Sequence, residues 1–475
     1  MRANRSPGCM LASVRVCLSG IAVCGVLLGG CQSYQPKSLD LQAYQTSYIQ
    51  RGVQLDSVQS FAEGLESERA LSEAFSIEDG VSCVEGEILS LFYNSELRLA
   101  RLRAGVALSA REHAGRWNDP VLHFDGADIL SASAPFDYGL TLGFSIPVSG
   151  RLGVEKDLAD AGYNVEVLRV IDLEWDVRHR VRSMWAQWST AVEQVELAET
   201  QMTEISQVSD LADQLEQAGE MVRAESRLLR IALAEGRSKL LLAKQEESRI
   251  YSELLELMGL PPSSSFELIA EIPSVGDLVE SGWFDRVRTN NTALAVERAR
   301  YFRAEQRLRL EIRKQYPDIE LGVGFGEEER EDRLLLGFSI PVPLLNGNRR
   351  AIAEAAAERE AARGSVESKL EHLMHQLKRL ELNHVALMNQ LHAVEIDVVP
   401  LLDEQTNEID QLMKLGDVNT LLLLETIDRN AKAKSHLLDL HLALRMNMNA
   451  HEAILGPDIR TDAELDGMEF NDETN

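Results

Sequence analysis

The chain has 475 residues and a formal net charge of -28, with 76 acidic side chains against 48 basic ones. This negative charge argues against a nucleic-acid partner, because a protein that binds phosphate backbones needs a basic surface. The sequence contains no nucleophile elbow, no zinc-protease motif and no phosphate-binding glycine loop. It therefore gives no indication of an enzyme, and we expect no cofactor and no bound metal.

The N-terminus predicts secretion. Arg2, Arg5 and Arg15 precede an apolar run over residues 16–28, and no acidic residue occurs before Asp40. This pattern is typical of a signal peptide, here residues 1–30, and the run is too short and too early for a transmembrane domain. Translation from Met10 would leave the apolar run unchanged.

The apolar run ends in Leu-Leu-Gly-Gly-Cys at Cys31, which resembles a bacterial lipoprotein box. The resemblance implies cleavage before Cys31, acylation of that cysteine, for example with palmitate, and sorting to the outer membrane because Gln32 follows. The alternative is an ordinary cysteine at the end of a plain signal. Once the signal is removed and Cys31 is acylated, Cys83 has no intramolecular partner, so no disulfide framework is expected.

The mature chain contains a long internal duplication. The hexapeptide Gly-Phe-Ser-Ile-Pro-Val occurs at residues 143–148 and again at 337–342. Asn94 corresponds to Asn291, and Gly219 to Gly416. A period of about 200 residues is far too long for a solenoid repeat, so one unit has been built twice. Its predicted order is helix, two strands, very long helix, turn and helix.

Apolar residues at steps of three and four predict a coiled-coil helix in each unit. In the first unit they are Val181, Trp185, Trp188, Val192, Val195, Met202 and Ile205, and in the second Leu370, Leu373, Leu377, Leu380, Leu387, Leu391, Val394, Val398 and Leu401, with His384 in the one polar position. Each helix should run for about 65 residues, or roughly 100 Å. Gly162, Gly364 and Pro400 are the only helix-breaking residues in these stretches.

Strict alternation of apolar with small or polar residues predicts strands at 138–146, 319–325 and 333–340, with a weaker one at 121–125. The pattern fits a membrane β-barrel, although a half-buried sheet in a soluble domain would alternate in the same way. Four strands cannot close a barrel, and open strand edges are not tolerated in lipid. The chain should therefore oligomerise, and three copies would supply twelve strands.

Together these features resemble the TolC-type outer-membrane factors. The resemblance rests on the duplicated unit, the lipoprotein box and the glycine turns. The segments 115–120 and 146–156 look most like the branch that serves heavy-metal and other resistance-nodulation-division pumps. The family implies a mainly α fold with membrane β: four strands per chain in a 12-stranded trimeric β-barrel that continues into a coiled-coil α-barrel. It also implies a homotrimer that works with a periplasmic adaptor protein and an inner-membrane efflux pump.

The resemblance also assigns roles to single residues. The hairpin turns that contact the adaptor would contain Gly219, Glu220, Arg223, Gly416 and Asp417. Glu425 lies where relatives narrow the duct with acidic residues, and Glu225 is its candidate counterpart in the first unit. A ring of three carboxylates would favour cations. Acidic residues on a solvated helix face are the alternative. His372 and His375 are one helical turn apart, but histidines on a polar helix face are the simpler interpretation.

The predicted organisation is a signal peptide at 1–30, a lipid-anchored segment at 31–81, a first repeat at 82–259, an equatorial linker at 260–280, a second repeat at 281–457 and a disordered acidic tail at 458–475. The predicted function is the outer-membrane exit duct of a tripartite efflux system, with metal cations as one candidate cargo. Two alternatives remain: a periplasmic coiled-coil scaffold lipoprotein without a channel, and a duct for type I protein secretion.

Overall fold

A computed structural model describes residues 34–49, 51, 58–62, 80–128, 136–264, 266–271, 282–414 and 419–457. The chain divides into two compact units, Met1–Arg51 and Gly52–Asn475. The first contains helix α2 (Leu41–Ile49), and the second contains both repeats. The signal peptide, Cys31, Gly416, Asp417 and the tail 458–475 lie outside the described residues.

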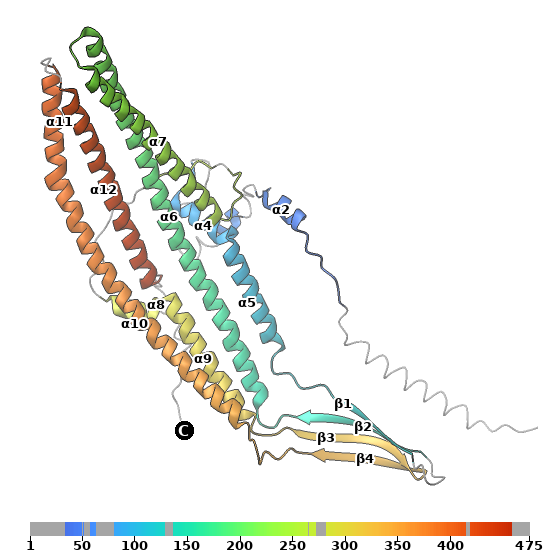
Figure 1. Cartoon of the computed structure of the whole chain (residues 1–475). Helices are drawn as coiled ribbons and strands as arrows, with labels where there is room; N and C mark the ends of the chain where they lie inside the picture. The colour runs from blue at the N-terminus through green and yellow to red at the C-terminus, as the bar shows by residue number, and fades with distance from the viewer. Residues whose placement is uncertain are drawn as a thin grey trace, which may run out of the picture. The chain divides into compact units, whose positions relative to one another are not determined.

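The first repeat has the predicted element order, except that its first helix is divided in two at Asn94. Its elements are α4 (Cys83–Tyr93), α5 (Ser95–His113), β1 (Val121–Ala127), β2 (Asp137–Ile146), α6 (Arg151–Ala218) and α7 (Arg223–Leu257). Helix α6 runs without interruption for 68 residues. It starts beside the sheet and ends at the turn into α7, so the strands and this turn lie at opposite ends of the helical part (Figure 1).

The second repeat follows the same order with one difference. Its elements are α8 (Trp283–Asn290), α9 (Thr292–Arg313), β3 (Ile319–Glu328), β4 (Glu331–Ser339), α10 (Arg349–Ala393), the π-helical turn η1 (Val394–Val398), α11 (Val399–Lys414) and α12 (Thr420–Leu455). The predicted single long helix is therefore α10, η1 and α11. The π-turn comes just before Pro400, which has no N–H to continue the α-helical pattern.

An asparagine clamp occurs at the same place in both repeats. Asn94 caps α5 by accepting hydrogen bonds from two backbone N–H groups, and its side-chain amide donates to the carbonyl of Leu257 at 2.9 Å. Asn291 caps α9 and donates to the carbonyl of Ile454 at 2.7 Å. Each clamp joins the start of one helix to the end of the last helix in the same repeat. This equivalence extends the duplication from sequence to structure.

A glycine follows each clamp for a steric reason. Gly259 and Gly456 have φ angles of 72° and 80°, a region that favours glycine. A Cβ atom on Gly259 would overlap the carbonyl oxygen of Tyr93, and one on Gly456 would overlap that of Asn290. The chain can pass this close to the capped helix start only without a side chain.

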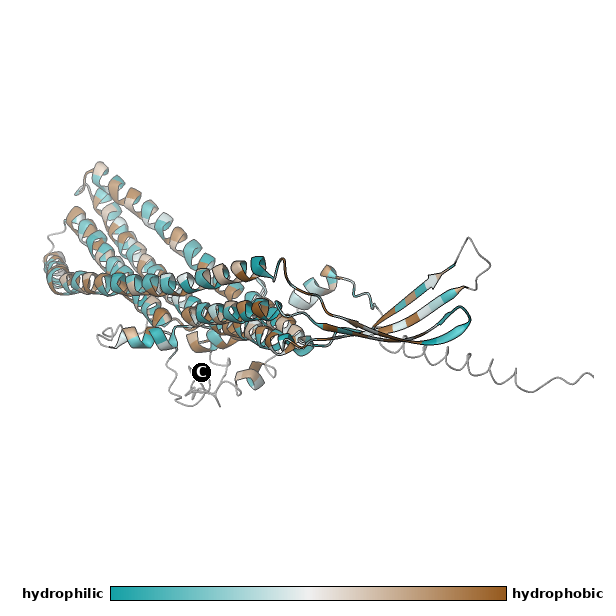
Figure 2. Cartoon of the chain, turned by 90° about the horizontal axis from the view of Figure 1, so that it is seen from below, coloured by the Kyte–Doolittle hydropathy of each residue, from teal (hydrophilic) through white to brown (hydrophobic). Residues whose placement is uncertain are grey.

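The four strands form one antiparallel sheet in the order β1-β2-β3-β4. The register brings apolar side chains from all four strands into the same rows. One row is Leu122, Leu142, Val323 and Leu336, and the next is Phe124, Leu140, Phe325 and Leu334. These side chains are between 37% and 76% exposed, so the sheet has a bare apolar face. Figure 2 shows the hydrophobic residues along the strands and a hydrophilic turn between β3 and β4.

The opposite face of the sheet carries mostly small and polar residues, with Leu335 of β4 as an exception. Thr141 pairs with Gly324, and Gly139 with Gly326. A Cβ atom on Gly324 would overlap the carbonyl oxygen of Leu140. Glycine therefore lets the strands approach closely on this face. Within the described part of the chain, the outer strands β1 and β4 have no further strand beside them, so the sheet of one copy is open at both edges.

The largest apolar core surrounds the middle of α6. Trp185 and Trp188 pack there with residues of α4 and α7 and with the start of the linker, including Leu260. Trp185 is 1% exposed, and its indole N–H donates to the carbonyl of Ile269 at 3.0 Å. In the second repeat, Leu373 and Leu377 of the predicted seam are buried against α8, α9 and the end of α12. The first seam and the α10 part of the second therefore lie on core faces, whereas Val398 and Leu401 at the end of the predicted second seam are 41% and 64% exposed.

Candidate functional site

The first hairpin turn is built around Gly219. Helix α6 ends at Ala218, and Gly219 caps it in the left-handed region with a φ of 80°. The N–H of Gly219 donates to the carbonyl of Glu216, and that of Glu220 to the carbonyl of Leu215, at 3.1 and 2.9 Å. Because these bonds satisfy the last carbonyls of α6, the chain can reverse within four residues and begin α7 at Arg223.

A network of charged groups joins the two arms of this hairpin just below the turn. Asp213 of α6 accepts hydrogen bonds from Ser226 at 3.0 Å and from Arg230 at 2.9 Å, both on α7. Glu216 pairs with Arg223 at 3.2 Å. The hydrogen bond from Arg230, followed by that from Ser226, lowers the pKa of Asp213. Of these residues the sequence analysis named Arg223 alone, since facing acids and bases on two antiparallel helices leave no local motif.

The second hairpin turn is described only in its helical arms. The predicted turn residues Gly416 and Asp417 lie outside the described residues, so their contact with an adaptor stays a prediction. Helix α12 begins at Thr420, and its N-cap Asn419 accepts a hydrogen bond from the N–H of Leu422 at 3.0 Å.

The two gate candidates have different surroundings. Glu425 is exposed on α12, and its carboxylate accepts a hydrogen bond from Arg429, one turn later, at 2.7 Å. Glu225 is half-buried in the first turn of α7 and forms no ion pair with the residues that the structure describes. The sequence contains a signal for this pair, because Arg429 follows Glu425 by four residues.

An acidic residue missed by the sequence analysis links the two hairpins. Asp428 of α12 lies 3.5 Å from Lys239 of α7 and 2.5 Å from Lys432 on its own helix. Gln201 of α6 also donates to it, at 3.5 Å. Partial burial raises the pKa of Asp428, but the hydrogen bond from Lys432 and the charge of Lys239 outweigh it, so the net shift is downward. Close to it, Ile427 packs with Leu229 of α7 and Ile205 of α6.

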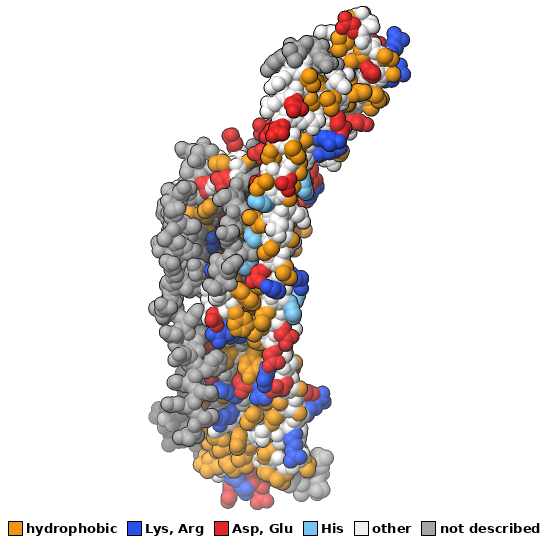
Figure 3. All heavy atoms as spheres, turned by 90° about the vertical axis from the view of Figure 1, so that its left-hand side faces the viewer, with side chains coloured by type: hydrophobic (Ala, Val, Ile, Leu, Met, Phe, Trp, Pro, Cys, Tyr) orange, Lys and Arg blue, Asp and Glu red, His pale blue; other side chains and the backbone are white. Residues whose placement is uncertain are grey.

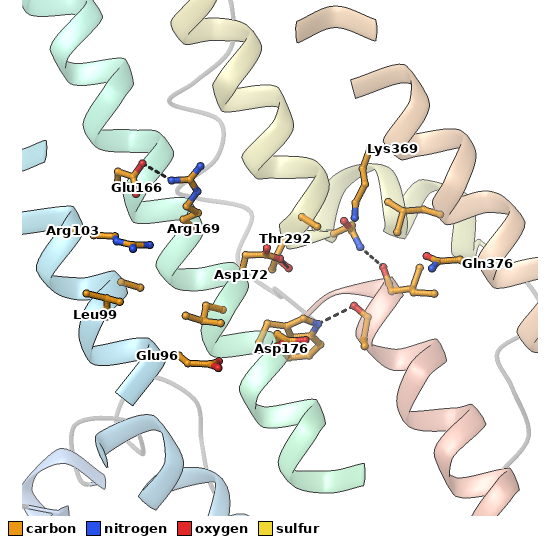
Figure 4. A pocket seen from close by; sticks show the side chains of 18 residues that line it. Glu96, Leu99, Arg103, Glu166, Arg169, Asp172, Asp176, Thr292, Lys369 and Gln376 are labelled. Atoms are coloured by element: carbon orange, nitrogen blue, oxygen red, sulfur yellow. Dashed lines mark hydrogen bonds and ion pairs between the residues drawn. The ribbon is translucent and has the colours of Figure 1, made fainter. Parts of the chain in front are cut away.

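A groove of about 680 Å³ lies where the two repeats meet. Figure 4 shows its walls: Glu96, Leu99 and Arg103 come from α5, Glu166 and Asp172 from α6, and Lys369 from α10. Asp172 accepts a hydrogen bond from the hydroxyl of Thr292 at 2.6 Å, and Glu166 pairs with Arg169 at 2.7 Å. Charges of both signs line this groove, and none of the predicted site residues lies in it.

The histidines of α10 do not assemble into a metal site among the described residues. His372 and His375 are exposed, whereas His384 is buried in the seam. No group of three or more His, Cys, Asp or Glu side chains in the described part of the chain could hold a metal ion. Figure 3 shows histidines spread along the α10 side of the molecule. The polar helix face remains the simpler interpretation of this pair.

No family model and no curated protein sequence matches the chain. Solved structures do match its fold. The structure of CusC, described in terms of transmembrane channel formation, matches with a TM-score of 0.66 at 16% identity, covering 79% of this chain and 92% of CusC. The outer-membrane channel OprN matches with a TM-score of 0.68 at 15% identity, over 79% of this chain and 89% of OprN. The outer membrane protein VceC from Vibrio cholerae gives 0.65 at 14% identity, over 79% and 96%.

These likenesses confirm the predicted fold class. The long helices and the four-stranded sheet together match outer-membrane channel proteins over most of the length of both chains. At this level of identity the likeness concerns the fold, and the roles of single residues must be argued from the chain itself.

Proposed function

We propose that this chain, which has the fold of the TolC-type outer-membrane factors, is one subunit of a trimeric exit duct in the bacterial outer membrane. The sheet carries the proposal. Its apolar rows are bare on one face, and its glycine-rich face is polar or small except for Leu335. A sheet of this kind suits a barrel wall between lipid and water.

The open sheet edges support closure by further copies. β1 and β4 end the sheet in the described part of one chain, and unpaired backbone groups in lipid cost several kcal/mol each. Pairing β1 of one copy with β4 of the next satisfies both edges. With three copies the barrel has twelve strands, and the hairpins would continue the duct into the periplasm.

The proposed trimeric duct also implies partners and a cargo. Lipid attached at Cys31 would anchor each copy in the outer membrane. The turns at Gly219 and Gly416 would meet a periplasmic adaptor, which delivers cargo from an inner-membrane pump. Glu225 and Glu425 would narrow the duct, and the negative charge of the chain fits cations, including metal ions, as cargo. We infer a conduit and no catalytic activity.

The barrel is tested by placing a charge on either face of β2. Leu142 lies on the apolar face and Thr141 on the opposite one. Leu142→Arg should cost roughly 2–4 kcal/mol per chain near the membrane midplane and reduce the trimer recovered from outer membranes. Thr141→Arg should assemble, because its side chain faces water. Equal trimer yields for the two variants would overturn the barrel proposal and favour a scaffold without a channel.

A further inference from the structure

The bare apolar face of the sheet continues beyond the end of β4. The strand ends at Ser339, but the alternation of apolar residues goes on through Ile340 and Val342 to Leu344. Val342 and Leu344 are 68% and 82% exposed, and Leu345 beside them is 97% exposed. Figure 3 shows hydrophobic side chains gathered at the lower end of its view, where the sheet meets α10. We call Val342, Leu344 and Leu345 the apolar ridge, and so exposed a ridge indicates a binding surface.

The two repeats differ at this point. In each repeat a residue in the left-handed region, Gly150 or Asn348, precedes the long helix. Between the shared Pro-Val pair and this residue, the first repeat has Ser149 alone, whereas the second has the loop 343–347. The two exposed leucines of the ridge are therefore particular to the second repeat.

A hollow of about 440 Å³ lies beside the ridge. Its walls come from the loop 343–347, from Gln315 just after α9, and from the first turns of α10, including Ile352. Apart from Arg349 and the amides of Gln315 and Asn346, the lining residues are apolar or glycine. The hollow thus offers one cationic group among apolar walls.

The charges around the hollow favour an anion. Arg349 is exposed and has no ion-pair partner among the described residues, and the same is true of Arg313 at the end of α9. The nearby acid Glu311 is already held by Lys314 at 2.7 Å and by Asn348 at 2.8 Å. In a chain with a net charge of -28, two free arginines therefore give this end of α9 a local positive charge.

A phospholipid meets both requirements of this surface. Leu344 and Leu345 suit acyl chains, and the guanidinium of Arg349 can donate two parallel hydrogen bonds to a phosphate group. The ridge continues the sheet face that contacts lipid in the proposed barrel. A neighbouring copy would pair with the edge of β4, within the plane of the sheet, and would leave this face free. Lipid therefore fits the ridge better than a second copy does.

We propose that the hollow between α9 and α10 binds the headgroup of an anionic phospholipid, with Arg349 on the phosphate and Leu344 and Leu345 among the acyl chains. The proposal rests on the outer-membrane duct proposed above and adds a specific lipid site at the border of the membrane. Basic side chains beside an apolar surface are the pattern that anionic lipid recognises.

Labelled cysteines locate the ridge relative to lipid. Leu345→Cys, carrying an environment-sensitive fluorophore and reconstituted in vesicles, should be quenched by brominated phospholipid. Leu336→Cys, in an apolar row of the sheet, is the positive control for the barrel, and Leu382→Cys, exposed far along α10, should not be quenched. Cys83 will not take up the label, because burial raises the pKa of its thiol to about 12.

The outcomes separate this site from the duct. Quenching at Leu336→Cys without quenching at Leu345→Cys would overturn the lipid site and leave the duct in place. A label at Leu345→Cys that is shielded from water but not quenched would show a neighbouring copy on the ridge, and would also overturn the site alone. No quenching at either position would overturn the duct and this proposal together.

The headgroup is tested by the heat stability of detergent-solubilised trimers. Phosphatidylglycerol should raise the temperature at which they dissociate more than phosphatidylcholine, which carries no net charge, and inorganic phosphate should not raise it. Arg349→Gln should remove most of the difference between the two lipids. Arg350→Gln is the matched control, because Arg350 pairs with Glu354 at 2.8 Å and does not line the hollow. Equal losses in the two variants, or equal effects of the two lipids on the wild type, would overturn the site at Arg349.

Discussion

The two repeats share one clamp but support their long helices in different ways. In the first repeat, α6 is unbroken and contacts α4, α5, α7, α9 and α12. In the second, α10 contacts α8, α9 and α12, and the helix changes to a π-turn before Pro400. Helix α6 is thus covered within its own chain. The long helix of the second repeat, in contrast, has an apolar side that is exposed in a single chain. The duplicated repeats thus share the asparagine clamp, while the packing around their long helices differs.

This difference assigns separate tasks to the repeats. The tryptophan core around α6 stabilises the single chain, because large buried aromatic side chains contribute most of the transfer free energy. The seam of α10 is thinner and includes the buried His384. Its outer side is apolar and exposed in the single chain. We expect substitutions between the repeats to affect folding of one chain, and substitutions on the outer side of α11 to affect assembly.

The largest predicted effect concerns pH and the interface between the repeats. His179 of α6 is buried, and burial, followed by the charges of Arg182 and Arg178, lowers its pKa to about 3. The folded protein therefore keeps this imidazole neutral, whereas the unfolded chain protonates it near its ordinary pKa of 6.5. Stability should fall as the pH drops from 6.5 towards 3, by about 1.4 kcal/mol per pH unit from this group.

Thermal unfolding of the detergent-solubilised protein across this pH range measures the effect. His179→Gln should unfold with a shallower pH dependence than the wild type, because Gln does not titrate. His372→Gln, on the exposed side of α10, is the matched control and should leave the slope unchanged. Identical slopes for wild type and His179→Gln would show that the buried imidazole does not control the stability of this interface.

The second prediction compares the clamps directly. Asn94→Ala and Asn291→Ala each remove a helix cap and a buried hydrogen bond to the other end of the repeat. Each should cost about 2 kcal/mol of unfolding free energy. Asn389→Ala, exposed on α10, should cost little. Thermal unfolding measures both losses of stability. If only one of the two clamp variants is clearly destabilised, only that repeat depends on its clamp.

Much of the architecture could be predicted from patterns within one chain. The strands at 138–146 and 319–325 and the long helix of the first repeat are found where alternation and three-four spacing place them. The split of the first helix into α4 and α5 was missed, although Asn94 is a strong cap signal. The π-turn was missed too, since Pro400 within a long helix does not by itself say how the backbone adjusts.

The candidate site was less predictable because its contacts join distant helices. Asp213 with Arg230 depends on how the antiparallel helices α6 and α7 face each other, and Asp428 with Lys239 depends on how helices of different repeats pack. No local sequence motif identifies an ion pair between residues of different helices. Gly219 at the first turn could be predicted from the sequence, because a positive φ strongly favours glycine. Roles for Cys31, Gly416 and Asp417 remain predictions from the resemblance alone.

The last prediction asks which repeat supplies the narrowest charged ring. Glu425→Ala should lower cation-over-anion selectivity in planar bilayers, because a ring of three carboxylates attracts cations. Arg429→Ala should raise it, since Arg429 partly neutralises Glu425. If Glu225→Ala has the larger effect instead, the first repeat lines the constriction. Glu235→Ala, exposed on α7, serves as the charge-matched control. Should it change selectivity as much as Glu425→Ala, the duct responds to its total charge and both candidate glutamates belong to a solvated helix face.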